Sequence, residues 1–152
     1  GAKIISTISD DSKLNFAYSL GSDYVINRKK KEISIEIEKL THGSGVDAVV
    51  DNAGEMTITA SINSVRRGGK IAMCGTTTGN VSNFKIRAFY SKQIQLYGIL
   101  IGSKLELLEL IDFVNKRRIL SGIDSIFSLT EVKAAHDRLE RGEQLGKILI
   151  KI

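Results

Sequence analysis

Residues 46–75 read VDAVVDNAGEMTITASINSVRRGGKIAMCG, and this stretch decides the fold class. Its two apolar segments, 46–51 and 70–74, are short and continuous, which is typical of strands buried on both faces of a parallel sheet. A helical pattern over 56–66 separates them, and each apolar segment is followed by small or polar residues. The unit therefore predicts an α/β protein with a mainly parallel sheet.

The same alternation continues on both sides of this stretch. Towards the N-terminus the pattern predicts strands at 1–7 and 24–26 and helices at 13–20 and 32–41. Towards the C-terminus it predicts strands at 94–100 and 147–152, with helices ending near residues 117 and 141. Ser103 with Glu106, and Ser128 with Glu131, have the spacing of a capping box, which predicts that a helix follows each serine.

Composition bounds the possible classes. A chain of 152 residues can bury one substantial core, and 42% hydrophobic with 26% charged residues argues against wholesale disorder. The single cysteine, Cys74, excludes an internal disulfide framework, and we expect it to be a small core residue within an apolar strand. No signal pattern and no apolar run of about 18 residues is present, so we expect a cytoplasmic protein with no membrane partner.

The net charge of +5 raises the question of nucleic-acid binding. The densest basic run is 28–31, and Glu32, Glu36 and Glu38 follow it closely. No aromatic residues for base stacking are interleaved with it. We interpret the run as a solvated turn and helix start, and we expect no nucleic-acid partner.

Three predicted loops follow strand ends, where ligands of open parallel sheets bind. They comprise residues 8–11, 51–54 and 75–79. Small residues let the backbone approach a ligand, and Asn and Thr side chains can bond ribose hydroxyls. Each could instead be an ordinary tight turn, but their recurrence at three successive strand ends favours a ligand site.

One element of a dinucleotide-binding sheet is expected to be missing from this chain. The pyrophosphate binds at a Gly-rich turn that follows the leading strand and opens a helix. The letters of such a fingerprint occur at 43–48, but there they follow a helix and precede a strand, so we interpret them as a helix end and turn. We predict an incomplete Rossmann-like, doubly wound sheet that lacks its first strand and Gly-rich turn.

Several segments together carry a family resemblance. The chain resembles the medium-chain alcohol dehydrogenase and quinone oxidoreductase superfamily at residues 1–7, 20–27, 45–52 and 67–71. The most specific match is the tail 135–148, which reads AHDRLERGEQLGKI. The resemblance covers essentially the whole chain but only the C-terminal part of the family's length. It implies that 1–123 is a partial dinucleotide-binding domain and that 124–152 returns to a GroES-like catalytic domain, absent here, which holds the catalytic zinc in the alcohol dehydrogenase branch.

The resemblance also implies a cofactor site. The expected cofactor-binding residues are Ser9, Lys13, Arg28, Asn52, Gly54, Gly75, Thr76 and Gly102. In this order they run from the adenosine ribose, along the adenosine side of the cleft, to the nicotinamide. In NAD-specific relatives the first strand here would end in an acid that binds both ribose hydroxyls, and Ile8 takes that place. Lys13 and Arg28 supply positive charge instead, which favours NADP, whose 2′-phosphate binds cations, although Asp10 could still serve NAD. The two cations could also be simple solvated surface residues.

The resemblance implies hydride transfer by an NAD(P)-dependent, zinc-type dehydrogenase or reductase, with this chain holding the nicotinamide cofactor. The chain offers no catalytic acid, base or metal ligand, because His42 and His136 lack metal-binding partners at suitable spacing. We therefore expect an isolated chain to be inactive, and its substrate stays open. The apolar edge strand 94–100 resembles the one that continues the sheet into a second subunit, so we expect a homodimer.

Three alternatives remain. The loop 51–54 resembles the Asn-Asn-Ala-Gly of short-chain dehydrogenases, but no tyrosine has a lysine four residues later. A methyltransferase shares the strand–helix–Gly-Gly-Lys pattern that ends at Lys70, but not the tail. A cofactor-free structural or assembly module derived from a dehydrogenase would also fit.

Overall fold

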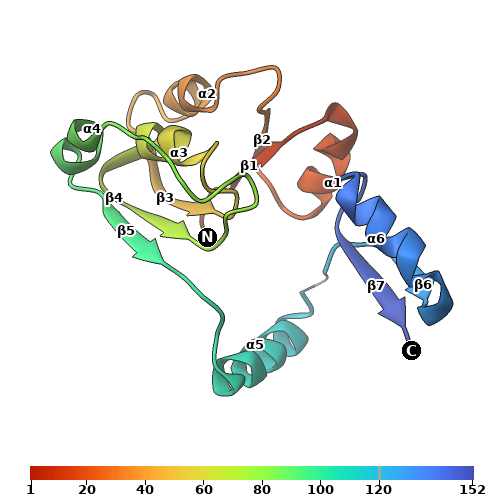
Figure 1. Cartoon of the computed structure of the whole chain (residues 1–152). Coiled ribbons are helices and arrows are strands. Elements are labelled where there is room, and N and C mark those ends of the chain that lie inside the picture. Colours follow the sequence, from red (N-terminus) through yellow and green to blue (C-terminus); the bar gives the residue numbers. More distant parts are fainter. Residues whose placement is uncertain (120) are drawn as a thin grey trace. The chain divides into compact units, whose positions relative to one another are not determined.

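The computed structural model describes residues 1–119 and 121–152, which fold as two compact units (Figure 1). The mid-chain unit comprises Ile5–Asp11 and Val25–Ile101. The terminal unit comprises Gly1–Ile4, Ser12–Tyr24 and Gly102–Ile152, and so contains both chain ends. In the described part of the chain, no helix is both long and apolar enough to span a membrane.

The mid-chain unit alternates strands and helices. In chain order these are β1 (Ile5–Ile8), β2 (Tyr24–Asn27), α2 (Ile33–Leu40), β3 (Val46–Asp51), α3 (Ile58–Ser64), β4 (Val65–Met73), α4 (Ile86–Ser91) and β5 (Gln95–Gly98). Strands β3, β4 and β5 form one sheet in that order, and both pairs are parallel. The predicted α/β class with parallel strands is therefore confirmed.

The strands of the described residues form three separate sheets, which differs from the single sheet expected from the sequence. Strands β1 and β2 pair with each other, β3, β4 and β5 form the second sheet, and β6 (Ile123–Ser128) pairs with β7 (Lys147–Lys151). Among the described residues β3 pairs only with β4, and no strand on its other edge connects it to the sheet of β1 and β2.

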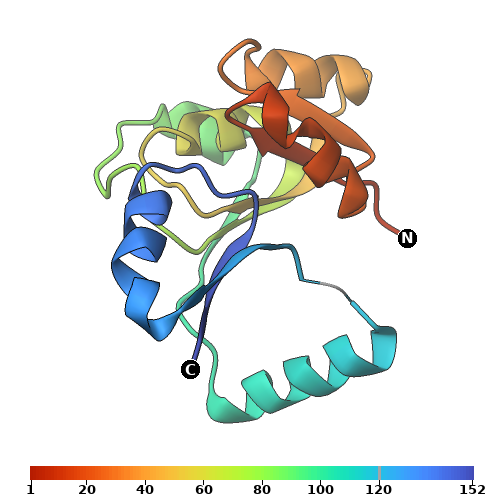
Figure 2. The ribbon, with the colours of Figure 1, turned by 90° about the vertical axis from the view of Figure 1, so that its right-hand side faces the viewer.

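The terminal unit contains the remaining elements. These are a 3-10 turn η1 (Asp11–Lys13) that leads into it, α1 (Leu14–Ser19), α5 (Lys104–Arg117), β6, a second 3-10 turn η2 (Leu129–Glu131), α6 (Val132–Glu140) and β7. Strands β6 and β7 run parallel side by side, with α6 packed against them (Figure 2). Both predicted capping boxes form, at Ser103 with Glu106 and at Ser128 with Glu131.

A small apolar core holds β4 in place. It consists of the buried residues Ile58, Ile62, Val65, Ile71 and Ile94, with Phe84 and Phe89 packed against it. Ile71, at the centre of β4, is completely inaccessible to solvent. Removing this apolar area from water stabilises the unit, so the end of β4 and its partner β3 are held firmly.

The helix predicted over 56–66 is shorter than expected, spanning Ile58–Ser64. Its end is set by Lys92, whose Nζ donates to the carbonyl oxygens of Ile62, Asn63 and Val65 at 2.7–3.1 Å. These carbonyls lie in the last turn of the helix and at its C-cap, Val65, where no further helical N–H groups are available to donate to them. The lysine ammonium supplies the missing hydrogen bonds.

Two strand limits and one burial prediction are also corrected. The first strand spans Ile5–Ile8 rather than 1–7, and the edge strand spans Gln95–Gly98 rather than 94–100. Cys74 is exposed, so its prediction as a core residue was wrong, because β4 already ends at Met73. The thiol lies in the loop that leads away from the sheet.

Candidate functional site

The loops that follow β3 and β4 are joined to each other by hydrogen bonds. At their base the Cys74 N–H donates to the Asp51 carbonyl at 2.9 Å. Further out, Thr78 donates to the Ala53 carbonyl from both its backbone N–H, at 2.9 Å, and its hydroxyl, at 2.8 Å. The Thr78 hydroxyl also accepts from the Met56 N–H at 3.1 Å. Two of the three loops expected to bind a ligand thus form a single surface.

Glycines permit this close contact. A Cβ on Gly75 would lie 2.3 Å from the carbonyl oxygen of Asn52, which no side chain tolerates. A Cβ on Gly54 would lie 2.8 Å from the Gly79 carbonyl oxygen, and Gly54 has a φ of +93°, which favours glycine. The glycines of both loops are therefore needed for loop–loop packing, whether or not a ligand also approaches them.

The buried carboxylate of Asp51 organises the first loop. Its Oδ1 accepts hydrogen bonds from the backbone N–H groups of Ala53, at 3.0 Å, and Gly54, at 3.1 Å. The hydroxyl of Thr57 also donates to Oδ1 at 2.7 Å, and that of Ser61 donates to Oδ2 at 2.7 Å. Burial alone raises the pKa of Asp51, but these hydrogen bonds outweigh it and hold the pKa below its ordinary value.

The expected cofactor residues of these two loops lie at the ends of neighbouring parallel strands. Asn52 and Thr76 have exposed side chains on adjoining loops, beyond the ends of neighbouring parallel strands. Gly54 is buried and Gly75 half-buried beside them. The loops therefore present two polar side chains that can bond ribose or amide groups, and backbone that a flat ligand can approach.

Ser9 and Arg28 occupy a second pair of strand ends. The Arg28 N–H donates to the Ile8 carbonyl at 2.9 Å, which sets the end of β2 beside the end of β1. Ser9 is half-buried, and the Arg28 side chain is exposed. Their placement at strand ends agrees with the expected position of a ribose site.

A set of polar contacts beside these strand ends was not expected from the sequence. The side-chain amide of Asn27, which is buried, donates to Asp11 Oδ1 at 2.5 Å, and Lys30 forms an ion pair with the same carboxylate. The bond from Lys30, followed by that from Asn27, lowers the pKa of Asp11. Lys30 had been interpreted only as part of a solvated basic run, and no local pattern pairs it with an acid 19 residues away.

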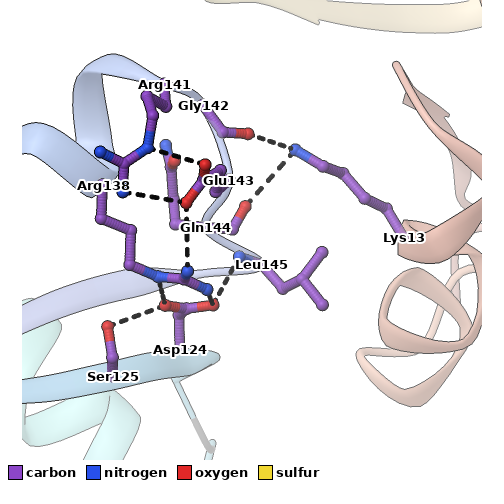
Figure 3. A network of polar contacts seen from close by, with 9 residues as sticks. All are labelled: Lys13, Asp124, Ser125, Arg138, Arg141, Gly142, Glu143, Gln144 and Leu145. Carbon is purple, nitrogen blue, oxygen red and sulfur yellow. Dashed lines mark hydrogen bonds and ion pairs between the residues drawn. The ribbon is translucent and has the colours of Figure 1, made fainter.

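Lys13 and Gly102, which complete the expected set, belong to the terminal unit. The Lys13 ammonium donates to the carbonyl oxygens of Gly142, at 3.3 Å, and Gln144, at 3.4 Å (Figure 3). A Cβ on Gly102 would meet only the Glu106 side chain, at 3.4 Å. Lys13 therefore links the start of α1 to the C-terminal tail, a role that its spacing in the sequence does not indicate.

The tail itself is ordered around Asp124. Arg138 forms two hydrogen bonds with the Asp124 carboxylate, at 2.8 and 3.0 Å, and the Leu145 N–H donates to it at 2.9 Å (Figure 3). The hydrogen bonds from Arg138, and next those from the Leu145 N–H and the Ser125 hydroxyl, hold the pKa of the Asp124 carboxyl far below its ordinary range, although burial opposes this shift. The tail 135–148, which carries the most specific family resemblance, thus contributes Arg138 and Leu145 to a hydrogen-bond network with Asp124.

Metal-binding side chains do not cluster in the part of the chain that the structure describes. There, no group of three or more His, Cys, Asp or Glu side chains is placed to hold an ion. What the described residues offer chemically is hydrogen bonding and close backbone approach at the ends of parallel strands, which is the behaviour of a nucleotide-binding α/β unit.

Comparison with known proteins identifies the family. Residues 1–116 match the zinc-binding dehydrogenases, and the chain belongs to this family, in the C-terminal region of the medium-chain alcohol dehydrogenase and quinone oxidoreductase superfamily. An NAD-dependent alcohol dehydrogenase from Sulfolobus acidocaldarius is 30% identical over 153 residues, covering 100% of this chain and 44% of the relative. A zinc-type alcohol dehydrogenase-like protein from Schizosaccharomyces pombe is 29% identical over 158 residues, covering 100% and 45%.

The fold similarity is equally extensive. The crystal structure of an NAD-dependent alcohol dehydrogenase matches with a TM-score of 0.91 at 27% identity, covering 100% of this chain and 44% of that chain. The chain thus spans less than half the length of the relatives that it matches. It is homologous to the cofactor-binding domain of zinc-type NAD(P)-dependent dehydrogenases.

Proposed function

We propose that this chain binds a nicotinamide cofactor for hydride transfer in a zinc-type medium-chain dehydrogenase or reductase. The observation that carries the proposal is the joined pair of loops after β3 and β4, with exposed Asn52 and Thr76 at the strand ends. In a doubly wound sheet this is the edge at which dinucleotides bind. The reactive nicotinamide is supplied by the cofactor, and the protein orients it.

The arrangement of the sheets supports the same proposal. In the doubly wound order 3-2-1-4-5-6, strands β1 to β5 of this chain would correspond to positions 2 to 6. Position 1 lies between positions 2 and 4, which are β1 and β3. The observed division into a β1–β2 sheet and a β3–β4–β5 sheet is the one that this assignment requires.

Each site residue would have a limited task. Asn52 and Gly54 would contact the adenosine side, and Gly75 and Thr76 the nicotinamide side. None of these residues can donate a proton to a substrate or bind zinc, so catalytic groups and substrate walls would come from elsewhere. The described loops fit the sugar and amide portions of NAD(P), because they offer exposed polar groups beside close-packed backbone.

We propose that cofactor choice depends on Ser9 and Arg28, which lie at neighbouring strand ends, whereas the Lys13 ammonium is bound to the carbonyl oxygens of Gly142 and Gln144. We propose a preference for NADP, because the exposed Arg28 guanidinium lies at the end of β2 and no acid ends β1. The named relative is NAD-dependent, and Asp10 offers a carboxylate that would serve NAD, so the two cofactors must be compared directly.

The test is a titration of the chain with NADPH and with NADH, each followed by cofactor fluorescence. We expect weak binding, with NADPH bound about tenfold more tightly, equivalent to about 1.4 kcal/mol for a charge-assisted phosphate contact. Arg28→Met should abolish the preference, whereas Arg87→Met, on α4, serves as a matched control that leaves it intact. If neither NADPH nor NADH binds at millimolar concentration, the result would favour a cofactor-free structural or assembly module.

A homodimer is the proposed assembly, with β5 as its contact. All four residues of β5 are exposed, and the strand lies at the edge of its sheet with exposed Ile99 and Leu100 following it. Unpaired N–H and C=O groups on such an apolar edge favour pairing with a second strand.

A further inference from the structure

We propose that Asp51 is the positioning residue of the joined-loop site, fixing the shape of both loops before any ligand binds. Its side chain holds residues 52–54, and its backbone carbonyl holds the start of the second loop through Cys74. The identity of the ligand rests on the proposed function, but the positioning role depends on the chain's own contacts.

Both oxygens of the buried Asp51 carboxylate are engaged by donors of the chain itself. One oxygen accepts from two successive backbone N–H groups and from the Thr57 hydroxyl, and the other accepts from the Ser61 hydroxyl. The residue is only 5% exposed. An acid that bound ribose hydroxyls or moved a proton would need a free, accessible oxygen, so Asp51 acts on the site through the backbone that it holds.

Both ends of the first loop are fixed by this one residue. The bonds to Ala53 and Gly54 fold the chain back on Asp51 directly after β3, while Thr57 and Ser61 tie the same carboxylate to the helix that follows. Only the loop between them is left to present Asn52. The backbone of Asn52 is therefore fixed on both sides, by Asp51 before it and by Ala53 and Gly54 after it.

The second loop takes its position from the first. The Ala53 carbonyl accepts from Thr78 twice, at 2.9 Å from its N–H and at 2.8 Å from its hydroxyl. Gly75 lies so close to the Asn52 carbonyl that a Cβ at this position would be only 2.3 Å from its oxygen. Any shift of Ala53 is thus transmitted to the loop that carries Thr76, so removing the Asp51 carboxylate should disturb both loops together.

The experiment measures backbone amide hydrogen exchange by NMR in the absence of ligand, for the wild type, Asp51→Asn, Asp51→Ala and Ser61→Ala. We expect the Ala53, Gly54 and Thr78 amides to exchange at least tenfold faster in Asp51→Ala. Asp51→Asn keeps one acceptor oxygen and should restore most of the protection. If Asp51→Ala does not fold, Asp51→Asn and Ser61→Ala should still accelerate the loop amides more than the Ile71 amide in β4.

Ile62→Val is the matched control, since it destabilises the core without touching the loops. Unchanged exchange of Ala53 and Gly54 in Asp51→Ala, or in Ser61→Ala where Asp51→Ala does not fold, would overturn the proposal. So would acceleration of the loop and Ile71 amides by the same factor, because that result shows general destabilisation alone.

NADPH and NADH titrations of the same variants separate this inference from the proposed function. Weaker binding by Asp51→Asn than by Ile62→Val, at matched stability, would support both. A wild type with protected loop amides that binds neither cofactor would contradict the proposed function and support the positioning role.

Discussion

Replacing Gly75 with alanine tests the contact on which the candidate site depends. The added Cβ would lie 2.3 Å from the Asn52 carbonyl oxygen and 3.0 Å from its carbon, whereas ordinary contact begins at 3.4 Å. Gly75 does not have a positive φ, so the alanine causes a clash and no backbone strain. The Asn52 peptide group must therefore move by roughly 1 Å, against overpacking that typically costs about 1–3 kcal/mol.

That movement also pulls on the bonds around Asn52. The neighbouring Asp51 carbonyl accepts from Cys74, and the Ala53 N–H donates to the Asp51 carboxylate. Weakening one such bond adds about 1 kcal/mol, which gives about 2–4 kcal/mol in all. A urea unfolding curve followed by far-UV circular dichroism should then shift its midpoint down by roughly 1 M or more.

Gly98→Ala is the matched control, because Gly98 also lacks a positive φ and a Cβ there meets nothing within 4 Å. Its midpoint should stay the same or rise slightly, since alanine restricts the unfolded chain. If Gly75→Ala unfolded at the same urea concentration as Gly98→Ala, the two loops would not be packed as described, and the site built on them would have to be abandoned.

Two further predictions concern the tail and the sheet edge. The pKa of Asp124 is depressed in the folded state, so its pairing with Arg138 stabilises the protein above the unfolded-state pKa of about 3.9 and is lost as pH falls through the folded-state pKa. Asp124→Asn should therefore lower the melting temperature most at pH 7 and progressively less below pH 4, and an equal loss at pH 7 and pH 2.5 would contradict this. Tyr97→Lys places a charge on β5 and should give a monomer by light scattering at concentrations where the wild type is dimeric; a wild type that is monomeric throughout would refute the proposed contact.

Local patterns were sufficient wherever the determining contacts are close in sequence. The strand 46–51 was predicted with its observed limits, because a short apolar run between a Gly-containing turn and a polar loop leaves little choice of boundary. The helix that starts after Ser103 was predicted equally well, since its capping box and its end at Arg117 lie within a single segment.

Long-range contacts decided the rest. The end of α3 depends on Lys92, which is 27 residues beyond Val65, and no periodicity reports such a partner. Strand β4 starts at Val65, five residues before the predicted start at residue 70, and its pairing with β3 has a register irregularity between Val46 and Ala48. Tertiary pairing overrode the local preference in both cases.

The same distinction between local and long-range contacts applies to the candidate site. The letters DNAG at 51–54 indicate a turn in which an aspartate accepts from backbone N–H groups two and three residues later. The bonds from Ala53 and Gly54 to Asp51 can therefore be predicted from the local sequence. The packing of α3 and β4 determines two further contacts, which no local pattern indicates. Ser61 donates to the same carboxylate, and the 75–79 loop adjoins the first loop.

The exposed Cys74 provides the molecule with a built-in chemical reporter. It is the only cysteine of the 152 residues, and its sulfur lies 3.7 Å from the Asp51 carbonyl oxygen, one residue before Gly75. A thiol-reactive dye would therefore attach at a single place, at the base of both loops. The emission of the attached dye would report ligand entry, in a protein that has no tryptophan to serve as an intrinsic probe.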